Sequence, residues 1–149
     1  MEILHLLADE AAQVGSSLIG ALNPTILGLI FGGSLLGLLV GAIPGLTATM
    51  ALALLINLSY GMPLSNAVAF LLSVYIGAVS GGLNAAIMIN IPGTPSAAAT
   101  CLDGFPLAKQ GKGGLAIGTG IIASFVGTLF SIMVMIFLSP LIYKIALRF

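Results

Sequence analysis

Apolar residues fill the chain almost without interruption, and no Asp, Glu, Lys or Arg occurs between Ala11 and Leu102. As one helix this stretch would be roughly 140 Å long, whereas the hydrocarbon core of a bilayer is about 30 Å thick. The chain must therefore turn back several times within or at the edges of a membrane. The pattern predicts an all-α, polytopic transmembrane protein whose helices are broken or re-entrant at two Pro-Gly motifs.

Glycine and proline divide the apolar stretch into segments. We expect residues 1–14 to form an amphipathic helix on the membrane surface and residues 15–149 to form membrane helices of one transmembrane domain. Asn23-Pro24 is typical of a helix start, and Gly81-Gly82 is expected to interrupt the chain. The predicted helical segments are 25–43, 46–58, 64–79, 85–91, 96–102 and 115–138, with a polar loop at 103–114.

Glycines also recur at four-residue spacing inside these segments. In lipid, such small-xxx-small frames let helix backbones approach closely. We therefore expect tight helix packing at the frames formed by Gly33, Gly37 and Gly41, by Gly77 and Gly81, and by Gly114 and Gly118.

The amino-acid composition argues against several classes of function. Only 5% of the residues are charged, compared with about 25% in soluble domains. The net charge is zero, which gives no electrostatic case for nucleic-acid binding. The sequence contains one cysteine and shows no nucleophile–base pair, metal-ligand cluster or cofactor motif, so we expect neither an enzyme nor a resident cofactor.

The two Pro-Gly interruptions, residues 41–47 and 90–96, are the candidate functional positions. Irregular backbone at membrane depth is tolerated only where protein buries it or water reaches it. Secondary transporters use such breaks to direct the N-termini of half-helices at anions and unwound carbonyls at cations. Hydroxyl residues follow both breaks, and the amides of Asn84 and Asn90 come just before the second. The candidate substrate-binding residues are Pro44, Gly45, Thr47, Asn90, Pro92, Gly93, Thr94 and Ser96.

A simpler interpretation competes with this one. Glycine and proline are common in membrane helices, where many such pairs only kink the helix. Two breaks of similar composition, each flanked by Thr or Ser, leave the kink and the binding site as comparable alternatives.

Few polar side chains outside the breaks invite a functional interpretation. Asn84 and Asp103 are candidates for coupling a cation, although a turn alone explains Asp103-Gly104. Lys109 and Lys112 either attract an anionic substrate or mark a cytoplasmic loop. Because proton relays in membranes usually need an embedded ionisable residue, we expect sodium rather than a proton as the coupling ion.

The strings GAIPGLTATM, MINIPGTPSAAAT and DGFPLAKQGKGG resemble the large membrane subunit, TctA, of the tripartite tricarboxylate transporters. The resemblance covers nearly the whole chain and corresponds to the N-terminal portion of that longer subunit. The residues at its motif positions are Gly41, Pro44, Gly45, Asn90, Pro92, Gly93, Thr94, Asp103, Gly104, Lys109, Gln110 and Gly111.

The resemblance implies a multi-pass permease of the bacterial inner membrane that imports citrate or related carboxylates with cation coupling. It further implies a periplasmic solute-binding protein and a small membrane subunit as partners. The alternative is a helix-packing or assembly subunit, or a truncated permease fragment, with no transport of its own.

Overall fold

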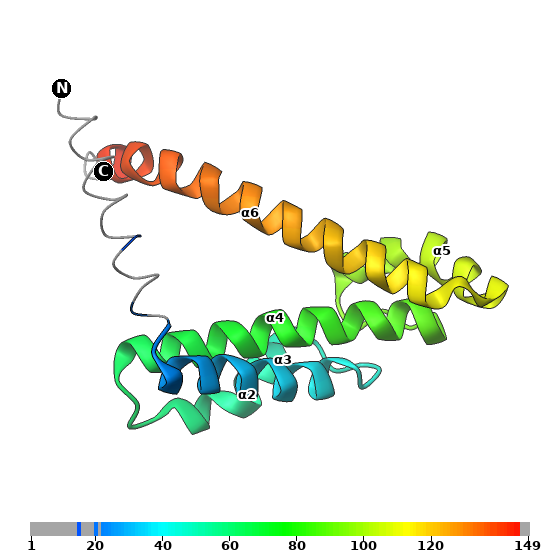
Figure 1. The fold of residues 1–149 in the computed structure, drawn as a ribbon, viewed down its shortest axis with the longest axis horizontal. Coiled ribbons are helices and arrows are strands. Elements are labelled where there is room, and N and C mark those ends of the chain that lie inside the picture. The colour runs from blue at the N-terminus through cyan, green and yellow to red at the C-terminus, as the bar shows by residue number, and fades with distance from the viewer. Residues whose placement is uncertain (1–14, 16–19, 21, 147–149) are drawn as a thin grey trace. The chain divides into compact units, whose positions relative to one another are not determined.

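The structure is a computed structural model, and its described residues are 15, 20 and 22–146. The surface helix predicted at 1–14 lies outside them. All elements of the described part are helical, which confirms the predicted all-α class (Figure 1). They are α2 (Pro24–Gly41), α3 (Ala48–Leu55), the 3₁₀ turn η1 (Ile56–Ser59), α4 (Leu64–Ile89), the 3₁₀ turn η2 (Pro95–Ala97), α5 (Ala98–Leu107), the π-helical turn η3 (Ala108–Lys112) and α6 (Gly113–Ala146).

Several of these helices are long and apolar enough to cross a membrane. Among the described residues, three stretches meet that condition: Pro24–Gly41, Leu64–Ile89 and the nearly continuous Pro95–Ile136. The shorter apolar helix Ala48–Ser59 lies between the first two. The chain therefore has the several membrane-crossing segments that the hydrophobic pattern predicts.

Contacts divide the chain into two compact units. One unit comprises residues 24–121, and the other comprises residues 1–23 together with 122–149. Both Pro-Gly breaks belong to the unit formed by residues 24–121, and the description of the site below concerns that unit alone.

Helices α2 and α4 pack backbone to backbone through glycines (Figure 1). A Cβ atom on Gly37 would overlap the carbonyl of Val74, and one on Gly41 would overlap the carbonyl of Ala78. Because both contacts advance by the same four residues, the two helices run in the same direction. The predicted tight packing is confirmed for this frame.

The contact is reciprocal, since glycines of α4 also face α2. A Cβ on Gly77 would overlap the carbonyl of Ser34, and one on Gly81 would lie 2.5 Å from the carbonyl oxygen of Leu38. In contrast, a Cβ on Gly114 or Gly118 would meet no atom within 4 Å. The prediction of close packing is therefore wrong for that third frame within the described residues.

Helix α3 and the turn η1 connect these parallel helices by returning along α4. Ala48 and Ala51 of α3 are buried against Phe70, Val74 and Ala78 of α4. Small residues on α3 let the short helix approach α4 closely. The turn Gly61-Met62-Pro63 then leads into α4, as the sequence predicts.

Two predicted interruptions are absent. Helix α4 runs continuously to Ile89, so Gly81-Gly82 does not separate residues 64–79 from 85–91; these glycines instead accommodate neighbouring backbone. The predicted polar loop at 103–114 is also mainly helical, and its only left-handed residue is Gly111, with φ of 76°. Charge in this segment indicates contact with water and does not prevent helix formation.

Candidate functional site

The first break, residues 42–47, uses its backbone donors in tight turns. The Ala42 N–H donates to the carbonyl of Leu38 at 2.9 Å, and the Ile43 N–H donates to the carbonyl of Val40 at 3.2 Å. The Leu46 N–H then donates to the Ile43 carbonyl at 3.2 Å. These bonds end α2 and reverse the chain.

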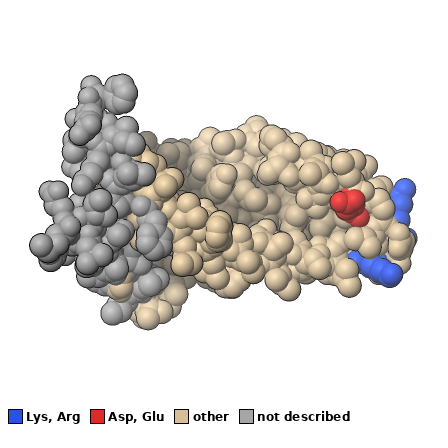
Figure 2. All heavy atoms as spheres, turned by 90° about the horizontal axis from the view of Figure 1, so that it is seen from above, with Lys and Arg blue, Asp and Glu red and all other residues tan. Residues whose placement is uncertain are grey.

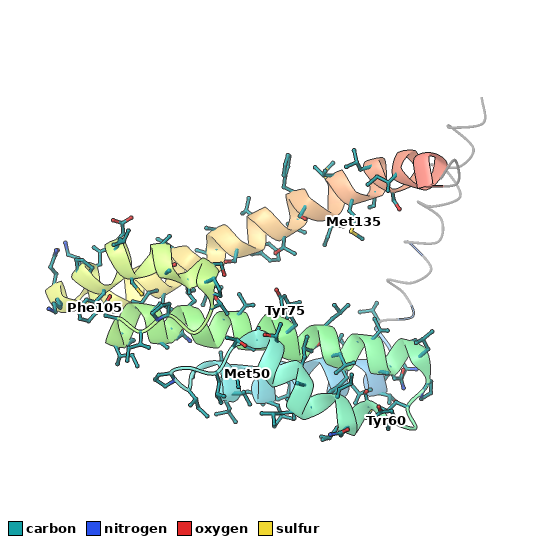
Figure 3. All side chains as sticks on the ribbon, turned by 180° about the vertical axis from the view of Figure 1, so that it is seen from behind. Met50, Tyr60, Tyr75, Phe105 and Met135 are labelled. Carbon is teal, nitrogen blue, oxygen red and sulfur yellow. The ribbon has the colours of Figure 1, made fainter. Side chains whose placement is uncertain are left out.

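Two further residues shape the first break. Gly45 has φ of 88°, a conformation that favours glycine because it has no Cβ. Thr47 is the N-cap of α3, and its Oγ1 accepts from the N–H of Met50 in the first turn of that helix at 3.3 Å (Figure 3). The same oxygen lies 2.8 Å from Oγ1 of Thr49. The Thr47 hydroxyl therefore has a local structural role.

The second break begins where Asn90 ends α4 in the left-handed conformation, with φ of 58°. Residues 91–94 then fold back along α4. A Cβ on Gly93 would lie 2.8 Å from Cα of Gly82, which is about 10 Å before the end of α4 at roughly 1.5 Å per residue. The close approach requires glycine at residue 93, whereas a Cβ on Gly82 would lie 3.4 Å from Cα of Gly93, an ordinary van der Waals contact.

The two breaks meet at this point. The Cβ position of Gly93 also lies 3.1 Å from the carbonyl oxygen of Gly41 and 3.7 Å from that of Leu46. Gly41 immediately precedes the first break and Leu46 lies within it, whereas Gly93 belongs to the second. Segments that are about fifty residues apart in the sequence therefore lie side by side next to Gly82.

The second break leaves backbone donors free. No hydrogen bond of the described residues outside the helices involves the N–H groups of Ile91, Gly93 or Thr94. Thr94 is buried, and its Oγ1 lies 3.0 Å from Oγ of Ser96. These groups precede η2 and α5, so the positive end of a helix adds to the donors.

One side chain of α4 has an unsatisfied polar atom. The Oδ1 atom of Asn84 is buried and has no hydrogen-bond partner. Asn84 lies three residues after Gly81, which contacts Ala42 at the end of α2. Asn84 is two residues after Gly82, and at about 3.6 residues per turn the two lie on nearly opposite faces of α4, so Asn84 points away from the contact between Gly82 and Gly93.

The candidate residues around the two breaks differ in how deeply they are buried. Thr47 is half-buried and Gly93 is buried with Thr94, whereas the other candidates around the breaks are exposed: Pro44, Gly45, Asn90, Pro92 and Ser96. The structure thus brings the two breaks together, with Gly93 and Thr94 at their centre.

Among the residues that the structure describes, the charged side chains gather where α5 turns into α6 (Figure 2). Asp103, Lys109 and Lys112 are exposed there. Lys109 places its Nζ 4.7 Å from the centre of the Phe105 ring on α5 (Figure 3). The neighbouring Gly104 packs against Ile87, close to the end of α4. These charges therefore lie near the C-terminal end of α4 and not at Gly82.

Two of the residues that build the site were missed as functional candidates in the sequence. Gly82 was expected to interrupt a helix, yet it supports the returning second break. Leu46 contributes only its carbonyl, which no side-chain pattern reveals. A glycine pair within a long apolar segment was the available signal for Gly82.

The fold and the site together define a polytopic helical membrane protein with discontinuous helices that meet beside a continuous one. The family described as "Tripartite tricarboxylate transporter TctA family" matches residues 27–149, and the chain belongs to this family.

A curated relative from Agrobacterium vitis, described as "Uncharacterized 52.8 kDa protein in TAR-I ttuC' 3'region", is 34% identical over 129 residues. The alignment covers 87% of this chain and 26% of the relative, so the chain spans about a quarter of that protein's length. No solved structure matches the chain.

Proposed function

We propose that the chain is the N-terminal portion of the permease subunit of a secondary transporter that imports citrate-like tricarboxylates across the bacterial inner membrane. The observation that carries the proposal is the meeting of the two Pro-Gly breaks beside Gly82. Membership of the TctA family supports the substrate class. It also supports a small membrane subunit and a periplasmic solute-binding protein as partners.

The second break is the proposed anion site. Its free N–H groups at Gly93 and Thr94 precede the positive end of a helix, an arrangement suited to carboxylate oxygens. The hydroxyls of Thr94 and Ser96 can donate to the same anion. Hydrogen bonds to a charged group are stronger than those between neutral groups.

The depth of Gly82 agrees with this role. At about 1.5 Å per residue, α4 is roughly 39 Å long, and Gly82 lies about 27 Å from its start at Leu64. Helix α4 thus exceeds the hydrocarbon thickness of about 30 Å. An apolar layer centred on α4 would contain Gly82 and the breaks beside it, on the side of the charged residues Lys109 and Lys112.

Import of a trianion against the membrane potential requires coupling. Each charge costs about 2.3 kcal/mol per 100 mV, so three charges face roughly 7 kcal/mol. No charged side chain lies between Ala11 and Leu102, and neutral oxygens suit sodium better than a proton relay. We therefore include sodium as the coupling ion.

A second candidate follows from the length of the matched region. The chain spans 26% of the curated relative. The alternative proposal is therefore that the isolated polypeptide is a helix-packing or assembly element that carries out no transport. Reconstituted alone, it would then bind no citrate and catalyse no uptake, yet it would associate with other membrane helices.

The experiment that tests the proposed site measures uptake of labelled citrate by the complete permease. We expect Gly93→Leu to abolish uptake, because its side chain would collide with Gly82. We expect Thr94→Val to lower the apparent affinity about tenfold or more through loss of a hydrogen bond to a charged group. Protein levels should remain normal.

Matched controls separate the site from general damage. A leucine at Gly114 meets open space in the described unit, and the hydroxyl of the exposed Thr119 bonds only to carbonyls of its own helix. Gly114→Leu and Thr119→Val should retain uptake. Normal uptake by Gly93→Leu and Thr94→Val would show that the anion site is assigned to the wrong residues.

A further inference from the structure

Helix α4 carries a hydroxyl group that its own backbone does not satisfy. The Oγ of Ser73 donates to the carbonyl of Ala69 at 2.6 Å, and the Oγ of Ser80 donates to the carbonyl of Ile76 at 3.0 Å. Tyr75 lies between these serines and is 44% exposed. Its ring holds the hydroxyl away from the helix, and this hydroxyl makes no hydrogen bond to any residue that the structure describes.

Tyr75 lies near the middle of α4 (Figure 3). It is eleven residues after Leu64 and fourteen before Ile89, so it lies about 17 Å from the start of the helix and about 21 Å from its end. A hydrocarbon layer centred on α4 would place it close to the midplane, whereas tyrosines that anchor helices lie at the membrane–water interfaces. A hydroxyl that faced hydrocarbon would have no partner. The position therefore indicates that Tyr75 faces water or a polar ligand.

Tyr75 and Gly82 share one face of α4. Seven residues turn an α-helix by about two full rotations and advance it by about 10 Å. The second break lies against Gly82 through Gly93. The side chain of Tyr75 therefore leaves α4 on the same side as the second break.

The helix that follows the second break begins on the Tyr75 side. Gly93 contacts Gly82, and Gly104 of α5 contacts Ile87, so the chain advances along α4 toward its end between these two contacts. Helix α5 starts six residues before Gly104, up to about 9 Å nearer to the level of Tyr75. The positive end of α5, which is the proposed anion site, therefore faces the half of α4 that contains Tyr75.

We propose that Tyr75 is a further substrate-binding residue, whose hydroxyl donates a hydrogen bond to the carboxylate of the substrate that lies farthest from Gly93 and Thr94. The inference rests on the proposed function, because it extends the proposed anion site. The field of a helix end falls off within one turn, so the start of α5 holds one carboxylate of a tricarboxylate and leaves the others to different donors. A phenol supplies such a donor without adding charge.

The first test is uptake of labelled citrate by the complete permease. Tyr75→Phe removes only the hydroxyl, so the protein level and the melting temperature should be unchanged. The KM for citrate should rise about tenfold or more, because a hydrogen bond to a charged group is lost. Tyr60→Phe is a matched control, since Tyr60 is 77% exposed in the turn before α4, and it should keep the normal KM. An unchanged KM in Tyr75→Phe would overturn the inference.

A second measurement distinguishes a substrate contact from packing against another part of the permease. After the native cysteines are replaced by alanine, Tyr75→Cys should react with a water-soluble, anionic thiol reagent, and citrate should slow this reaction. Ile76→Cys is a control at the same depth on another face of α4, where Ile76 is 59% exposed, and citrate should not change its reaction. Tyr75→Cys that does not react, or whose reaction citrate leaves unchanged in a permease that still binds citrate, would overturn the inference.

The two proposals fail in distinguishable ways. Absence of citrate uptake by the unmodified complete permease would refute the proposed function. Normal uptake by the unmodified permease, together with an unchanged KM in Tyr75→Phe, would refute the role of Tyr75 and keep the proposed function.

Discussion

The two Pro-Gly breaks have similar sequences but opposite backbone chemistry. The first follows α2 and closes its donors in turns, and the carbonyl oxygens of Gly41 and Leu46 accept no hydrogen bond from the described part of the chain. The second precedes α5 and makes no turn of that kind between Asn90 and Thr94, and its N–H groups at Ile91, Gly93 and Thr94 donate to none of the described residues. Position relative to a helix end decides which polar groups a break presents.

The comparison teaches why the two breaks belong together. A negative helix end and a positive helix end converge on Gly82 of the uninterrupted α4. One such end attracts cations and the other attracts anions. Two helices that were only kinked would not need to bring ends of opposite polarity together. The arrangement therefore favours a binding role over simple bending.

The largest effect is expected when the close contact between α2 and α4 is disrupted. Gly41→Leu would drive a side chain into the Ala78 carbonyl of α4 and cost at least about 3 kcal/mol, the upper end of overpacking penalties. The complete permease should accumulate poorly and elute as aggregate in size-exclusion chromatography. Gly32 meets no atom within 4 Å, so Gly32→Leu should behave normally. Equal yields of the two variants would refute the tight α2–α4 contact.

A smaller effect distinguishes the two threonines that follow the breaks. Thr47 caps α3, whereas Thr94 lies at the proposed anion site. Thr47→Val should lower stability by about 1 kcal/mol through loss of the cap and leave the KM for citrate unchanged. Thermal unfolding and uptake kinetics measure the two quantities, and Thr47→Ser should restore the melting temperature. A large rise in KM for Thr47→Val would place its hydroxyl at the substrate instead.

The smallest effect is expected at the charged turn. Lys112 is exposed and lies beyond the end of α4, so solvent screens its attraction for an anion at Gly93. Lys112→Gln should raise the KM for citrate roughly two- to threefold at low ionic strength and have no effect at high salt. Uptake measured across a salt series provides the readout. A large effect that persists in high salt would mean that Lys112 contacts the substrate directly.

Local sequence was sufficient to predict the two Pro-Gly breaks, although the interruption expected at Gly81-Gly82 is absent. Pro44-Gly45 and Pro92-Gly93 both fall in irregular backbone, and the glycine frame at Gly37 and Gly41 packs against α4 as predicted. Proline and glycine act within one or two residues of their position, so their effect can be predicted without knowledge of the fold.

Other features depended on contacts that the sequence does not display. Gly82 supports the second break because Gly93 folds back onto it, and nothing near either residue reveals that contact. The segment 103–114 is polar because it is exposed, yet its backbone is mainly helical. Polar side chains indicate that a segment is exposed to water. They do not determine whether its backbone is helical, which also depends on the hydrogen bonds that neighbouring turns can form.

The most direct test of the paired breaks is chemical labelling of the second one. In a complete permease whose own cysteines, Cys101 included, are replaced by alanine, Ser96→Cys places a thiol beside Thr94. A water-soluble maleimide should label it, and citrate with sodium should slow the labelling, while Ser59→Cys in η1 is labelled at the same rate with or without them. Labelling of Ser96→Cys that citrate and sodium leave unchanged, in a permease that still transports citrate, would contradict the proposed site.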